Sequence, residues 1–101
     1  MKIPKSVKVG GLVYDIIVNH DVNHESNSWG SIHQQTQRIF IEGGLSSQKN
    51  GEVLLHELIH ACLYHSGYSS NLPEADEEKI VHALTPSLYQ VLKDNKLRFY
   101  D

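Results

Sequence analysis

The chain has 101 residues, enough for one domain over residues 1–101 with a single modest core. Its composition, 40% hydrophobic and 21% charged, is typical of a soluble globular protein. A net charge of -3, with the nine Lys and Arg residues scattered, argues against a nucleic-acid partner.

The sequence also gives no sign of a membrane partner or of export. No apolar run approaches the roughly 18 residues that a membrane span needs. Residues 1–5 are not followed by the apolar segment of a secretory signal. A single cysteine, Cys62, excludes an internal disulfide and suits a reducing compartment, so we expect a cytoplasmic protein.

The first 45 residues are predicted to form β structure. Residues 7–9 and the run 12–18 are rich in β-branched side chains and are separated by Gly10-Gly11, a pattern typical of a hairpin. The polar segment 19–27 is predicted to be a loop. A second strand pair is expected at 28–33 and 37–41, with a turn at 34–36.

A helix is predicted to begin after Ser46 or Ser47, either of which can cap it, and to run to about His65, where Ser66-Gly67 provides a stop. Apolar residues, Cys62 among them, cover most of its circumference. We therefore expect this helix to form the buried centre of the domain.

A second helix is predicted to follow, with Pro73 in its first turn and the acidic residues of 74–78 favoured by the helix dipole. Pro86 should kink or divide this helix, which ends at Asp94-Asn95. The expected fold class is α+β, with a small antiparallel sheet before the two helices. One apolar stripe on the second helix should pack it on the first: Ile80, Val81, Leu84, Leu88, Val91 and Leu92.

The predicted first helix carries the sequence His56-Glu57-Leu58-Ile59-His60. Residues four apart lie on one helix face, so the two imidazoles can bind one ion, and zinc accepts imidazole nitrogen readily. Glu57 is turned about 100° away, where its carboxylate can reach a metal-bound water as general base. We therefore expect Zn²⁺ bound by His56 and His60, with Glu57 as the catalytic residue.

A catalytic zinc usually has a third protein ligand and an open position. Carboxylates of the second helix can reach the ion if that helix runs back along the first, and Glu78 is favoured over Glu77. His82, four residues after Glu78, can hydrogen-bond a ligand histidine from outside. The remaining candidates for the third ligand are His65, Asp76 and His82 itself.

The motif at 56–60, followed by an acidic helix start, resembles the gluzincin group of metallopeptidases. The chain as a whole is similar to small zincin-like proteins of phages and prophages, and to minimal metallopeptidase domains of the ImmA/IrrE and SprT types. The resemblance implies a zincin-like fold, Glu78 as the third zinc ligand, and a bacterial or phage protein with possible peptidase activity. Pro86 departs from the pattern of that group.

Together these features predict a zinc metallopeptidase that acts on a peptide or protein substrate. The strand at 29–33 offers an edge on which an extended peptide can add. The alternative is a non-catalytic zincin-like binding module with a structural zinc, closed by a protein ligand such as His65, Asp76 or Glu77. The candidates for a donor to the developing oxyanion are Tyr64, His65, Tyr68 and His82.

Overall fold

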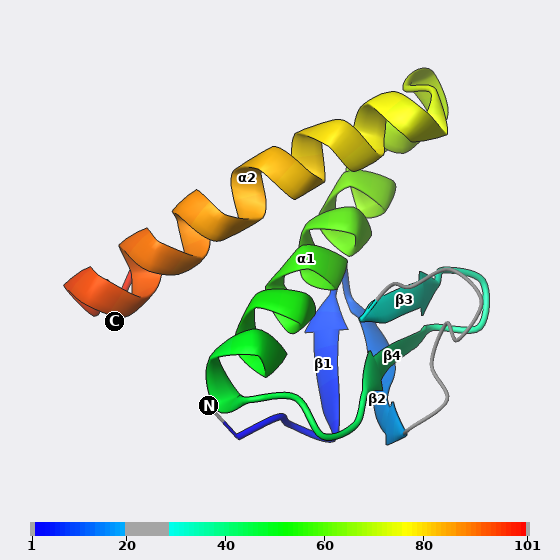
Figure 1. Cartoon of the computed structure of the whole chain (residues 1–101). Coiled ribbons are helices and arrows are strands. Elements are labelled where there is room, and N and C mark those ends of the chain that lie inside the picture. Colours follow the sequence, from blue (N-terminus) through cyan, green and yellow to red (C-terminus); the bar gives the residue numbers. More distant parts are fainter. Residues whose placement is uncertain (1, 20–28, 101) are drawn as a thin grey trace.

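The computed structural model describes residues 2–19 and 29–100, which form a four-stranded sheet followed by helices (Figure 1). The predicted α+β class is confirmed. The strands are β1 (Ser6–Val9), β2 (Leu12–Asn19), β3 (Gly30–His33) and β4 (Arg38–Glu42). The helices are α1 (Ser47–His65), the short 3-10 helix η1 (Tyr68–Asn71) and α2 (Glu74–Asn95).

The sheet is mixed, with the strand order β1-β2-β4-β3. Both expected hairpins are present, because β1 pairs with β2 and β3 pairs with β4 in antiparallel fashion. The central pair, however, is parallel, with Ile16 opposite Ile39 and Val18 opposite Ile41. The prediction of an antiparallel sheet is therefore wrong at β2 and β4, whose pairing joins distant segments and has no local turn signal.

The turns set the bounds of the strands. Gly10 and Gly11 have positive φ angles of 59° and 83°, the left-handed conformation in which glycine is least strained. Gln37, at 57°, also has a positive φ, so β4 begins one residue later than predicted. The predicted loop at 19–27 and the start of the strand at 28 fall largely outside the described residues, and Asn19 is the last residue of β2.

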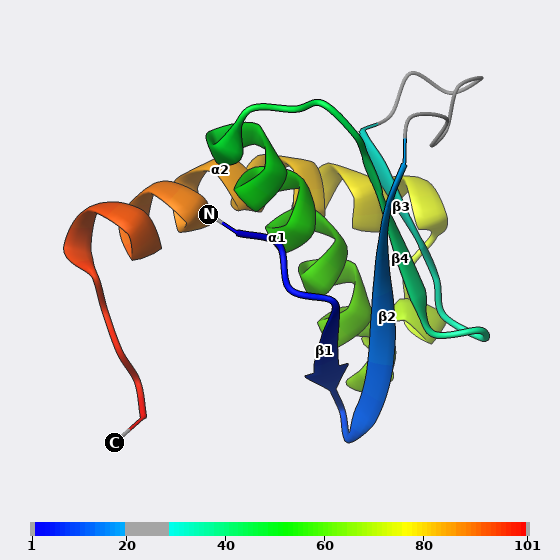
Figure 2. The same ribbon diagram turned by 90° about the horizontal axis from the view of Figure 1, so that it is seen from below.

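Helix α1 lies between the sheet and α2 (Figure 2). Ser46 caps it as predicted, accepting a hydrogen bond from the Lys49 backbone N–H at 3.1 Å. Cys62 is exposed, against the prediction, because the sheet and α2 cover only part of the helix surface. The core cluster joins one face of α1 to β2 and β4: Tyr14, Ile39, Ile41, Val53, Leu54 and Ala61.

Helix α2 runs through Pro86 as one helix, so the expected division does not occur. Its end at Asn95 is as predicted. It approaches α1 closely at Gly51, where an added Cβ would lie 2.8 Å from the Tyr89 ring. Only Val81 and Thr85 are buried on α2, and three residues of the predicted stripe are exposed: Ile80, Leu84 and Val91. Among the helices of the described residues, none is long and apolar enough to cross a bilayer.

Candidate metal centre

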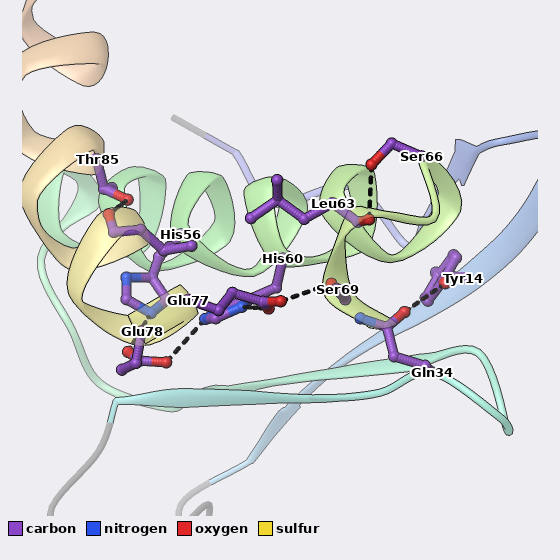
Figure 3. Close-up of polar contacts among 11 residues, drawn as sticks. Tyr14, Gln34, His56, His60, Leu63, Ser66, Ser69, Glu77, Glu78 and Thr85 are labelled. Carbon is purple, nitrogen blue, oxygen red and sulfur yellow. Dashed lines mark hydrogen bonds and ion pairs between the residues drawn. The ribbon is translucent and has the colours of Figure 1, made fainter. Parts of the chain in front are cut away.

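The two histidines of the motif and one carboxylate of α2 meet on the face of α1 that α2 crosses (Figure 3). Glu78 Oε1 lies 2.9 Å from His56 Nε2, and Glu78 Oε2 lies 2.9 Å from His60 Nε2. One potential ligand atom from each residue falls within 4.8 Å of the others. Two imidazole nitrogens and a carboxylate oxygen are donors that zinc accepts, so this group fits the ion in chemistry and spacing.

Glu77, the residue before Glu78, contacts the opposite nitrogen of the His60 ring. Glu77 Oε2 lies 2.6 Å from Nδ1 of His60, the ring nitrogen on the side away from Glu78. Its other oxygen, Oε1, accepts a hydrogen bond of 2.5 Å from the Ser69 hydroxyl. Burial raises the pKa of Glu77, but the hydrogen bonds from Ser69 and His60 outweigh it and hold the pKa below its ordinary value. Glu77 thus supports His60 from outside the group of potential ligands.

The other candidates for the third ligand lie elsewhere. His65 Nε2 is 2.8 Å from the hydroxyl of the buried Tyr14, at the far end of α1. Asp76 is exposed and does not join the group within the described residues. His82 contacts His56 edge to face, with ring centroids 6.1 Å apart. The role expected of His82, a hydrogen bond to a ligand histidine, is filled by Glu77.

Sequence reasoning did not find Ser69. It lies in a stretch with Ser66 and Ser70, and nothing in the residue types separates the three. Glu77 does have a sequence signal, because it lies in the acidic start of the second helix, next to Glu78, and is one of the alternatives for the third ligand.

Burial sets the protonation of two groups at the site. Burial lowers the pKa of His56, although Glu78 opposes the shift. The lowered pKa favours the neutral imidazole, which is the form that binds metals. Glu57 is 5% exposed, and burial raises its pKa to about 7, with His60 opposing and Glu78 adding to the shift. A carboxylate with this pKa can take up and release a proton near neutral pH, as a general acid–base requires.

Gly30, the first residue of β3, allows the sheet to approach Glu57. An added Cβ at Gly30 would lie 2.6 Å from Val53 Cγ1 and 3.1 Å from Glu57 Oε2. Both contacts are shorter than a real Cβ normally makes, so the glycine is required by the close packing of β3 on α1. A glycine inside a predicted strand is the sequence signal for such an approach.

We therefore expect Gly30→Ala to push β3 away from α1 and to lower the free energy of unfolding by about 1–3 kcal/mol, the usual cost of overpacking. Urea unfolding of the variant measures this. Val53→Ala removes Val53 Cγ1, the nearest of the three atoms that the new methyl group meets, so the double variant should be more stable than the two single losses predict by addition. Strict additivity would contradict the proposed clash.

A cleft of about 740 Å³ opens beside the group of potential ligands. One wall includes Trp29 and the first residues of β3, and the others come from α1 and α2. Of the four expected donors to an oxyanion, Tyr64, His65, Tyr68 and His82, only His82 lines this cleft within the described residues. A molecule in the cleft would therefore contact β3, Glu57, His56 and His60 together.

Comparisons with known proteins do not identify the chain. No protein-family model, curated protein or solved structure matches it.

Proposed function

We propose that the protein is a zinc-dependent peptidase, with the ion bound by His56, His60 and Glu78 and with Glu57 as general base. The observation that carries the proposal is the meeting of three metal-ligand atoms within 4.8 Å beside a buried glutamate, at the wall of an open cleft. When bound, zinc would polarise a substrate carbonyl and lower the pKa of water to about 7.

The position of Glu57 supports its role in proton transfer. Its carboxylate is buried next to β3, and the raised pKa of about 7 suits transfer in both directions. Glu57 would take a proton from the attacking water and donate it to the leaving amine. Neither step requires a second acid–base residue.

An extended peptide is the substrate that the cleft supports best. β3 is an edge strand of the sheet, and its first residues line the cleft. A peptide can add to such an edge through main-chain hydrogen bonds, which would bring its carbonyl groups past the histidines. Trp29, which is 49% exposed at the start of this wall, offers an apolar surface for a substrate side chain. We propose a peptide or unfolded protein segment, cleaved in the reducing cytoplasm of a bacterium.

A structural zinc would need a fourth protein ligand that closes the site. His65 and Asp76 are too remote from the group or turned away from it, and Glu77 is bonded to the other nitrogen of His60. Among the described residues the group therefore has three members and faces the cleft. This arrangement favours the catalytic function over the non-catalytic module.

The test is hydrolysis of an unfolded protein such as casein by the zinc-loaded chain, with products identified by mass spectrometry. We expect cleavage that a chelator abolishes, that zinc restores, and that a peptide hydroxamate inhibits by occupying the open position. A zinc-loaded chain that neither cleaves casein or peptide libraries nor binds the hydroxamate would support the structural-zinc alternative and contradict the proposal.

A further inference from the structure

We propose that Ser69 is a positioning residue for the metal centre: its hydroxyl fixes Glu77, and Glu77 in turn fixes the tautomer and orientation of His60. The inference rests on the proposed zinc site and adds to it a residue from η1, an element that supplies no ligand.

The geometry gives Glu77 two partners, one at each carboxylate oxygen (Figure 3). The Ser69 hydroxyl donates to Oε1 at 2.5 Å, and His60 Nδ1 lies 2.6 Å from Oε2. Because a carboxylate only accepts hydrogen bonds, Nδ1 must be the donor. The side chain of Glu77 is half-buried, so these two bonds are shielded from competing water.

The Nδ1–H bond decides what the opposite nitrogen can do. A neutral imidazole carries one N–H, and when this is on Nδ1 the lone pair is on Nε2. Nε2 also faces a carboxylate, that of Glu78 at 2.9 Å, so its lone pair is used only when an ion lies between Nε2 and Glu78. With the ion bound, Glu77 would hold the N–H on Nδ1 and so keep the tautomer whose lone pair points to the ion, as groups outside the ligand set do in metal sites.

Ser69 is held in place by its turn. Gly67 precedes η1 with a positive φ of 81°, and Ser70 Oγ donates to the Gly67 carbonyl at 2.8 Å. The end of η1 is closed by the Leu72 N–H, 3.3 Å from the Ser69 carbonyl. Without the Ser69 hydroxyl, Glu77 would keep His60 as its one side-chain partner among the described residues and could rotate away.

The experiment compares the zinc affinity of the full chain and of Ser69→Ala, measured by competition with a chromophoric chelator. Loss of a group that supports a ligand typically lowers metal affinity about 10- to 100-fold. Because Ser69 acts on His60 only through Glu77, we expect Ser69→Ala to lower the zinc affinity by about 10-fold, the lower end of this range. Glu77→Gln should lower it by about 10- to 100-fold. The absorption spectrum of bound Co²⁺ should change in both variants, because the orientation of His60 changes.

Two matched variants separate positioning from a general effect on the turn. Ser70→Ala removes a neighbouring hydroxyl of η1 that donates to the Gly67 carbonyl instead of to Glu77, so it measures the effect of loosening the turn and should lower the affinity less than Ser69→Ala does. Ser69→Thr keeps the hydroxyl and should restore most of the affinity. Unfolding of each metal-free variant shows whether the fold is intact.

The outcomes distinguish this inference from the proposed function. Unchanged zinc affinity and Co²⁺ spectrum in Ser69→Ala would overturn the role of Ser69 and leave the peptidase proposal standing. Equal losses in Ser69→Ala and Ser70→Ala would also overturn it. A wild-type chain that binds zinc without peptidase activity would refute the function, while the effect of Ser69 on affinity could still be measured.

Discussion

Glu57→Gln is expected to abolish peptidase activity while zinc stays bound. The amide has nearly the shape of the carboxylate but cannot accept the proton of the attacking water, and loss of such a group typically costs about 10²- to 10⁴-fold in rate. Casein cleavage and zinc content measured on the same preparation check this. Unchanged activity would remove Glu57 as the base.

The same substitution should stabilise the metal-free protein above neutral pH. Burial raises the pKa of Glu57 from 4.5 to about 7, so the folded chain keeps its proton over a range in which the unfolded chain loses it. Stability therefore falls as pH rises from 4.5 through 7, by about 3 kcal/mol when the shift is converted at 1.36 kcal/mol per unit. Glutamine carries no charge, so the variant escapes this loss.

Urea unfolding with a chelator at pH 5 and pH 8 measures the effect. The difference between Glu57→Gln and wild type should be small at pH 5 and should favour the variant at pH 8. Glu52→Gln is the control, because it removes a less buried carboxylate from the same helix. An equal change at both pH values, or the same pattern in the control, would contradict the assignment to the buried charge of Glu57.

Zinc is expected to stabilise the fold strongly, and His60→Ala is expected to remove that stabilisation. Zinc present at about 100 times its dissociation constant should add about 2.7 kcal/mol to the free energy of unfolding. His60 contacts both Glu77 and Glu78, so its loss removes a ligand and leaves two carboxylates without their shared partner. Thermal unfolding with and without zinc measures the difference.

His82→Ala is the matched control for this prediction. His82 lies on α2 beside the site and touches the ring of His56, but it is not in the group of potential ligands. Its removal should leave most of the response to zinc. A response lost equally in both variants would contradict the assignment of the ligands.

The sequence could predict the features of the site that a single helix determines. His56, Glu57 and His60 lie within five residues of α1, so helix geometry alone brings the two imidazoles to one face. The choice between Glu77 and Glu78 is different. These neighbours differ by about 100° around α2, and only the packing of α2 on α1 decides which one faces the imidazoles.

The same distinction between local and distant contacts holds for the fold. The hairpin at Gly10-Gly11 and the helix start at Ser46 have local signals and were predicted. The parallel pairing of β2 with β4 and the exposure of Cys62 depend on how distant segments pack. The bond of His65 to Tyr14, which keeps this histidine from the metal group, spans 51 positions in the chain and has no signal in the residue pattern.

The small buried surface of α2 affects which site residues can be substituted without loss of stability. Only two of its side chains are buried, while Glu77 and Glu78 join it to the histidines of α1. The residues of the proposed metal centre therefore also help to hold α2 on α1. A variant without the proposed activity would still gain stability from these contacts, so the presence of His56, His60 and Glu78 alone would be a poor guide to activity. Glu57, whose buried charge destabilises the fold, is the residue that such a variant could lose without cost to stability.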